Sequence, residues 1–313
     1  MNQRVRKLLS MDTLRKIIPL AGLIIVILVF SFTTNGLFLR WNNIQSLIMQ
    51  AAITLVAATG TVFVMAHNNL DFSLGGACAL SAVLSYLVTG GELIPFFIMC
   101  IVFGVMCGLI SAFIHIGGRV PAFMAGLCIM FAGRGLAQTV SASQTMLMVG
   151  AAQFNQLWFF LVVLIVVFGA CYFLFNYTKV GKYQKLIGTN PTATQLSGIN
   201  VNKYKTLAFV ICGVTLGIAA CLTIVRSAAV NGNTGLNLET DVLLALSLGG
   251  ISMQGGSATR IRSAIIGVMF YFILDNGLLL WGLDADYVDI VKAIFFLLTV
   301  TISIDRSQYS VIA

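Results

Sequence analysis

Few residues in this chain could do chemistry, and most of them lie inside or beside long apolar runs. His67, Asp71 and Ser73 form one polar cluster, and Asp275 with Asn276 forms a second near the other end of the chain. Ser, His and Asp are the residue types of nucleophilic catalysis, but no nucleophile motif such as GxSxG surrounds them. A membrane-embedded enzyme is therefore the weakest hypothesis, and no catalytic residue is assigned.

Metal and nucleotide chemistry also lack support. The seven cysteines lie in apolar runs without a CxxC pair, and neither histidine has a Glu or Cys at ligand spacing. The cysteines are expected to be packing residues, and no metal site is predicted. A GxxxxGK[ST] motif is missing, because the one Gly-Lys pair, Gly181-Lys182, is followed by Tyr. Any ATP must be bound and hydrolysed by another subunit, so no cofactor is expected on this chain.

Membrane-spanning helices must position the polar residues. Of the 313 residues, 59% are hydrophobic and 9% are charged, against about 25% charged in an ordinary soluble domain. A span takes about 20 apolar residues, so the sequence predicts about ten spans. They lie near 17–34, 44–66, 72–90, 93–116, 120–141, 156–176, 205–225, 239–252, 261–281 and 287–304. We expect an all-α polytopic bundle forming a single transmembrane domain over 1–313, with 1–16 and 177–204 as cytoplasmic segments.

The basic residues predict the orientation, because cytoplasmic loops are enriched in Lys and Arg. Both termini are placed in the cytoplasm. With this orientation, Arg40 and Arg226 fall on the extracytoplasmic side, and Arg134 and Lys292 lie within spans. All the others of the eighteen Lys and Arg fall on the cytoplasmic side. The formal charge of +8 is dispersed beside apolar runs, so topology explains it and nucleic-acid binding is not expected.

A short string is repeated in the two halves of the chain. Ser73-Leu-Gly-Gly76 returns as Ser247-Leu-Gly-Gly250, and both copies mark short or interrupted apolar segments. Transporters with repeated halves place their substrate path at such breaks, so we predict pseudo-repeated halves. The residues assigned to the translocation pathway or helix break are Asn68, Asn69, Asp71, Ser73, Gly75, Gly249, Gly250 and Asn276.

Each of these assignments has a plainer alternative. The glycines could serve close helix packing. Asp71 could cap the third span through the N–H groups of Ser73 or Leu74. Arg134, which lies inside an apolar run, could belong to a buried ion pair.

The long hydrophilic loop carries the signals of a short helix. Asn190 suits an N-cap, Pro191 the first helical position and Gly198 a left-handed C-cap. The resulting helix has about two turns and would be unstable alone in water. We expect it to dock, either onto the rest of the chain or, as the favoured interpretation, onto a partner protein at the cytoplasmic face.

At this loop the chain resembles the permease subunits of carbohydrate-type ABC importers, such as the ribose, galactose, xylose and autoinducer-2 systems. The family pattern is like G-x-N-x-x-A-x-x-x-S-G-I, and it is matched by Gly188, Asn190, Ala193, Ser197, Gly198 and Ile199. A second string, similar to G-G-I-D-L-S-V-G, keeps Asp71, Ser73 and Gly75 but departs at 67–69. A third, L-G-G-x-S-x-x-G-G, is matched over 248–256, and the resemblance extends roughly over 40–304.

The resemblance implies a permease without enzymatic activity of its own, in the bacterial plasma (inner) membrane. Implied partners are an ABC ATPase subunit, an extracytoplasmic solute-binding protein, a second permease in a homodimer or heterodimer, and membrane lipid. The ATPase-coupling residues would be Gly188, Asn190, Pro191, Ala193, Leu196, Ser197, Gly198 and Ile199. The solute would be small and polar. A monosaccharide is the first expectation, and nucleosides and autoinducers stay open. An ion-coupled secondary transporter is the alternative function.

Overall fold

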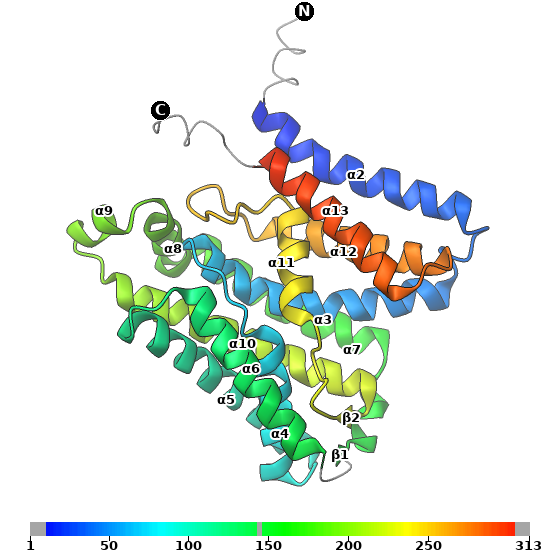
Figure 1. The fold of residues 1–313 in the computed structure, drawn as a ribbon, viewed down its shortest axis with the longest axis horizontal. Coiled ribbons are helices and arrows are strands. Elements are labelled where there is room, and N and C mark those ends of the chain that lie inside the picture. The colour runs from blue at the N-terminus through cyan, green and yellow to red at the C-terminus, as the bar shows by residue number, and fades with distance from the viewer. Residues whose placement is uncertain (1–10, 143–145, 304–313) are drawn as a thin grey trace, which may run out of the picture. The chain divides into compact units, whose positions relative to one another are not determined.

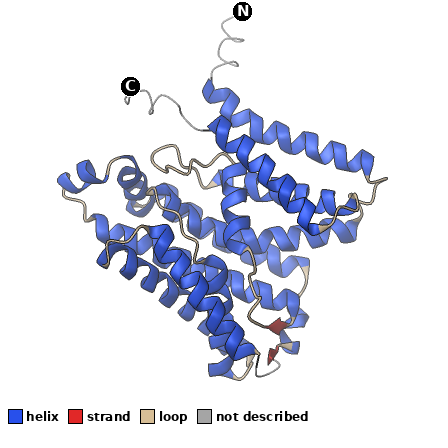
Figure 2. Ribbon diagram, in the orientation of Figure 1, coloured by secondary structure: helices blue, strands red, loops and turns tan. Residues whose placement is uncertain are grey.

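The computed structural model describes residues 11–142 and 146–303, and helix is the main element there (Figure 2). The helices are α2 (Met11–Thr33), α3 (Trp41–Ala66), α4 (Leu74–Thr89), α5 (Leu93–Ala112), α6 (Ala122–Ser141), α7 (Leu157–Tyr177), α8 (Lys179–Thr189), α9 (Pro191–Leu196), α10 (Val201–Ser227), α11 (Leu238–Leu248), α12 (Arg262–Leu280) and α13 (Ala285–Ser303). A π-helical turn, η1 (Phe113–Gly117), continues α5, and a 3-10 helix, η2 (Val149–Phe154), precedes α7.

Each predicted span is occupied by a helix, and the expected all-α membrane bundle is confirmed. In the described part, six helices are long and apolar enough to cross a membrane: Trp41–Ala66, Leu93–Gly117, Ala122–Ser141, Leu157–Tyr177, Val201–Ser227 and Arg262–Leu280. The eighth predicted segment contains α11, which is only 11 residues long. Residues 1–10 of the predicted N-terminal segment and residue 304 of the last predicted span lie outside the described residues.

The helices form two compact units. Of the described residues, one unit consists of 11–47, 244–252 and 262–303, and the other of 48–142, 146–243 and 253–261. The first, called unit 1, contains α2, α12 and α13. The second, called unit 2, contains α4 to α10 and most of α3.

Glycines let the helices of unit 2 approach closely. A Cβ atom added at Gly104 of α5 would lie 3.0 Å from the Cα of Gly217 in α10, and one added at Gly108 would lie 3.4 Å from the Cα of Gly213. The contact between α5 and α10 is therefore largely backbone against backbone, as in small-residue interfaces of membrane helices. Figure 1 shows α4, α5, α6 and α10 running together in this unit.

A two-stranded ribbon adds to the helices. β1 (Met146–Leu147) pairs antiparallel with β2 (Ala229–Val230), with Met146 opposite Val230. It joins the segment before η2 to the end of α10. The sequence could not predict this ribbon, because strands of two residues leave no alternating pattern to recognise.

Candidate coupling and translocation sites

The short loop helix α9 forms with the predicted caps. The side chain of Asn190 accepts a hydrogen bond from the N–H of Ala193 at 2.9 Å, and Pro191 occupies the first turn. Gly198 has φ +80°, and its N–H donates to the carbonyl O of Gln195 at 3.0 Å. A left-handed residue after a helix favours glycine. The caps hold the helix ends although α9 is only 6 residues long.

The outer surface of α9 is exposed. Leu196 is 85% exposed, whereas Thr194 faces inward and is buried. The side chain of Leu196 is therefore accessible on the outer side of α9. The role of α9 in coupling stays a prediction at this point.

Gly188, just before α9, touches the end of α3. A Cβ atom at Gly188 would collide with the carbonyl O of Ala66 and would lie 2.7 Å from the backbone N of Gly256. The N–H of Gly256 donates to that same carbonyl at 2.9 Å. A Cβ atom added at Gly255 would lie 2.7 Å from the backbone N of Asn68. The structure therefore joins segments from all three family-like strings in one junction of unit 2.

Asp71 is buried before the first turn of α4. Its Oδ1 accepts a hydrogen bond from the N–H of Ser73 at 2.8 Å. This is the capping interaction that the sequence offered as the plainer alternative for Asp71. Gly126 of α6 packs against the same turn, since a Cβ there would lie 2.6 Å from the backbone N of Phe72. A pathway role for Asp71 and Ser73 stays a prediction.

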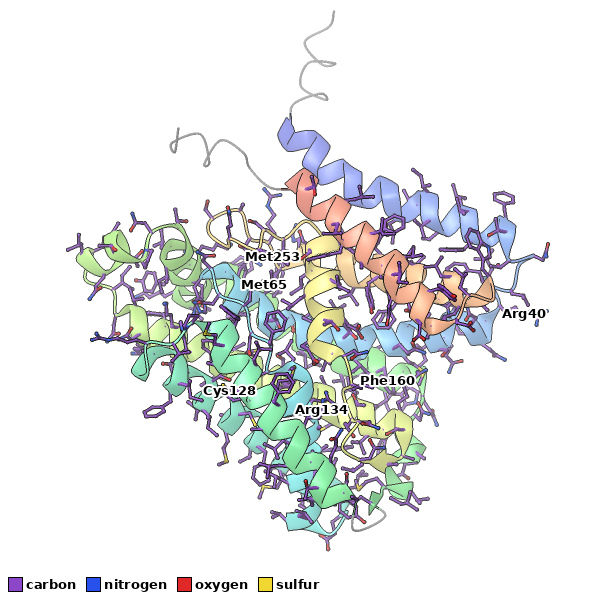
Figure 3. All side chains as sticks on the ribbon, viewed as in Figure 1. Arg40, Met65, Cys128, Arg134, Phe160 and Met253 are labelled. Atoms are coloured by element: carbon purple, nitrogen blue, oxygen red, sulfur yellow. The ribbon has the colours of Figure 1, made fainter. Side chains whose placement is uncertain are left out.

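Gly75 lies where two charged side chains meet. A Cβ atom added at Gly75 would lie 2.6 Å from Nη2 of Arg134 and nearer still to Oε2 of Glu239. Arg134, labelled in Figure 3, donates to the carbonyl O atoms of Gly232 and Gly235, each at 3.2 Å. Arg134 therefore binds backbone carbonyls, although an ion pair was the expected alternative to a functional role.

Glu239 was missed in the sequence, where it stands at the start of the eighth predicted span. Its side chain is only 8% exposed in the first turn of α11. An acidic residue at the start of a short apolar segment was the available signal, because such groups inside membranes are expensive and tend to be functional.

Three predicted pathway residues, Gly249, Gly250 and Asn276, lie in unit 1, and a pathway role for them stays a prediction. A Cβ added at Gly249 would collide with the carbonyl O of Ser263 and lie 3.1 Å from the N of Gly267. Gly250 has φ +79° and follows the end of α11. The amide of Asn276 exchanges hydrogen bonds of 2.8 and 2.9 Å with that of Asn43. At Gly249 the structure thus shows the glycine-packing alternative. The predicted pathway set is divided between the two units.

Unit 1 also contains a buried lysine with a complete set of partners. Lys292 is 7% exposed, and its Nζ lies 2.8 Å from Oδ1 of Asp275 and 2.6 Å from Oδ1 of Asp289. It also donates to the hydroxyl of Tyr271 at 3.1 Å. Charges within apolar helices pair with each other in this way. The pair with Asp275 joins α13 to α12, whereas Asp289 lies on α13 itself.

The cysteines are mostly packing residues, as predicted. All seven lie in the described part and are free, and all except Cys128 are buried. Cys128 is exposed on α6.

Apolar helices of spanning length, buried charges within them and an exposed capped loop helix define a multi-pass membrane transport protein. The chain belongs to the family described as branched-chain amino acid transport system / permease component, which matches residues 43–300. The permease recognised in the sequence is thereby confirmed.

Named relatives cover nearly the whole chain. The ribose import permease protein of Escherichia coli (strain K12) is 30% identical over 90% of this chain and 91% of its own length. The ribose import permease protein of Bacillus subtilis (strain 168) is 29% identical, with 94% of each chain covered. The xylose transport system permease protein of Escherichia coli (strain K12) is 26% identical over 92% of this chain and 91% of its own. No solved structure matches the chain.

Proposed function

We propose that this chain is the permease subunit of an ABC importer and forms the membrane pathway for a monosaccharide. The family description names branched-chain amino acids, whereas the relatives that align over about nine tenths of the chain are named for ribose and xylose. Similarity to named relatives over nearly the full chain is stronger evidence about the solute than the description of a broad family. A pentose is therefore the solute to test first. The chain carries no ATPase motif, and a separate subunit binds the ATP.

The exposed, capped helix α9 is the observation that carries the proposal. A docked helix transmits force only if it is rigid, and the Asn190 and Gly198 caps provide that rigidity. Its exposed Leu196 offers an apolar anchor to a groove of the ATPase. An ion-driven transporter needs no such cytoplasmic contact, so the secondary-transporter alternative is not favoured.

The remaining parts of the proposal follow from this class. The subunit works as a homodimer or heterodimer of permeases in the bacterial inner membrane and receives solute from an extracytoplasmic binding protein. It has about ten spans, pseudo-repeated halves and both termini in the cytoplasm. The pathway passes the helix break around Asp71, Ser73 and Gly75.

The test is co-expression with the ATPase and binding-protein subunits, followed by co-purification and by ATP-dependent ribose uptake into vesicles. In Ala193→Asp, a charge enters the exposed face of α9, and an unpaired charge at an interface weakens binding at least about tenfold. We expect the ATPase to be lost from the purified complex while the permease still inserts. Ala152→Asp, on the exposed surface of η2, is the matched control and keeps the ATPase.

Uptake that follows a proton or sodium gradient, in a chain that purifies without an ATPase, would overturn the importer proposal. Full ATPase recovery with Ala193→Asp would show that α9 is not the coupling helix.

A further inference from the structure

An open groove lies in unit 2 between the end of α5 and the start of α10. Its volume is about 460 Å³, and its lining is mostly apolar: Leu109, Ala112, Phe113, Ile116, Gly117 and Thr206. The first five belong to α5 and to the π-helical turn η1, and Thr206 lies in the second turn of α10. None of these residues belongs to the sets predicted for the pathway or for coupling, so the groove has no role in either.

A ridge of large apolar side chains runs along α5 into this groove. Its members are four residues apart, with a last step of three, and rows of this spacing form ridges on a helix. They are Ile94, Ile98, Val102, Met106, Ile110 and Phe113, each between 43% and 77% exposed. Phe113 also lines the groove, and α5 with η1 is long and apolar enough to cross a membrane. Ridge and groove therefore form one apolar surface on a spanning helix.

The dimensions and side chains of this surface suit a lipid tail. A tail reaches through half of the hydrocarbon core, about 15 Å, which equals about ten residues of α-helix. Helices in membranes associate through small residues, but the two glycines within α5, Gly104 and Gly108, already lie against α10. What α5 leaves exposed is large and apolar, which favours a flexible tail over a second helix.

Two exposed basic residues stand beside the groove. Lys203 is three residues before Thr206 and is therefore its neighbour on the same face of α10. Arg119 follows Gly117 by two residues. Neither basic side chain forms an ion pair within the described part of the chain. Segments 113–120 and 200–206 contain no Asp or Glu, so the charge that these segments place beside the groove is positive.

We propose that this groove binds an anionic phospholipid, with one acyl chain along the ridge of α5 and its phosphate held by Lys203 and Arg119. Basic residues next to the end of a spanning helix attract anionic headgroups, and the apolar lining accepts the start of the tail. The lipid contacts α5 and α10 together, close in the sequence to the end of α9. The inference depends on the place of the chain in a membrane and not on its solute.

The headgroup contact is tested on the full-length chain, purified in detergent, by native mass spectrometry. The probes are phosphatidylglycerol and phosphatidylcholine with the same acyl chains, and phosphatidylglycerol is expected to bind more tightly. Lys203→Gln and Arg119→Gln each remove one charge and are each expected to weaken phosphatidylglycerol binding about fivefold, with phosphatidylcholine unaffected. The matched control is Lys182→Gln, which changes an exposed lysine of α8 outside the groove lining and keeps wild-type binding.

Gly117→Leu tests the groove itself, because the larger side chain fills it. A Cβ atom added at Gly117 would lie 3.6 Å from the ring of Phe113, an ordinary contact. We expect the preference for phosphatidylglycerol to be lost and the unfolding temperature to be kept. The control is Gly169→Leu on α7, where an added Cβ meets nothing within 4 Å, and it keeps the preference.

Several outcomes would overturn the lipid site. Equal binding of the two lipids by the wild-type chain excludes a headgroup preference. An equal loss in Lys182→Gln and Lys203→Gln makes the preference a property of the whole basic surface. Retained preference in Gly117→Leu excludes the groove. If Gly117→Leu instead breaks a dimer and leaves lipid binding unchanged, a second copy of the chain covers the groove.

Discussion

His67 follows the last residue of α3 and is only 2% exposed. Its Nδ1 lies 3.0 Å from the carbonyl O of Phe63. Burial lowers the pKa of His67 to about 3, and nearby Lys205 and His115 act in the same direction, against the bond to Phe63. The imidazole is therefore neutral in the folded protein throughout the physiological range.

This burial predicts a pH-dependent stability. An unfolded histidine takes up a proton below about pH 6.5, whereas folded His67 stays neutral down to about pH 3. The unfolded state therefore binds more protons in this window, and stability falls as the pH drops, by about 1.4 kcal/mol per pH unit. Thermal unfolding in detergent at pH 7.5 and pH 5.0 measures this loss, about 2 kcal/mol.

His67→Gln removes this contribution, so its unfolding midpoint is expected to change less between the two pH values. An equal change in both proteins would contradict the assignment to His67.

Residues that act locally could be predicted, and residues that meet across the fold could not. Asn190, Pro191 and Gly198 take their predicted places because capping depends on a few neighbouring residues. Glu239 meets Arg134 and Gly75 only through the packing of α11, α6 and α4, and no short pattern in the sequence encodes that meeting.

At the scale of elements, we predict that the junction of α8 with α3 transmits motion of α9 to the membrane domain. Gly188 lies in the last turn of α8, two residues before the Asn190 cap, and packs directly on the carbonyl O of Ala66. The adjoining segment of unit 2 adds the hydrogen bond from Gly256. Backbone contacts of this kind have little freedom to yield, because no flexible side chain lies between the helices.

Gly188→Ala is expected to push α8 away from α3. Overpacking of this kind costs about 1–3 kcal/mol, and we expect a lower unfolding temperature and reduced ribose uptake with the ATPase still bound. The matched control is Gly169→Ala in α7, where an added Cβ meets nothing within 4 Å. Equal stability and equal ribose uptake in Gly188→Ala and Gly169→Ala would contradict the prediction that the junction of α8 with α3 transmits motion.

Helices were predictable as elements because each needs one long apolar run. The positions of α3, α7 and α10 agree with the predicted spans to within a few residues. The ribbon of β1 and β2 was not predictable, since it pairs segments that lie far apart in the sequence. The π-helical turn η1 was not predictable either, because it continues the apolar run of α5 without a break.

At the scale of the whole chain, the compact units do not follow the order of the sequence. Unit 1 takes residues from both ends of the chain, and unit 2 takes most of the middle. The repeated Ser-Leu-Gly-Gly string predicted two sequential halves, and the repeat stays a prediction. Contacts between distant segments decide which helices form a unit, and composition alone does not reveal those contacts.

The predicted orientation can be tested with reporter fusions. Basic loops should stay in the cytoplasm, so alkaline phosphatase fused after Gly282 is expected to be active and the same enzyme fused after Asn200 inactive. A fluorescent protein at the C-terminus is expected to fluoresce. Active phosphatase after Asn200 would place α9 on the wrong side for coupling.

The exposure of Leu196 has a consequence for the cell that makes this subunit. A permease copy without its ATPase displays an 85% exposed leucine on a cytoplasmic helix, and exposed apolar groups are what chaperones and quality-control proteases bind. Orphan copies are then removed faster than assembled ones. If α9 is the coupling helix, as proposed, the same helix would thereby keep the numbers of permease and ATPase subunits matched.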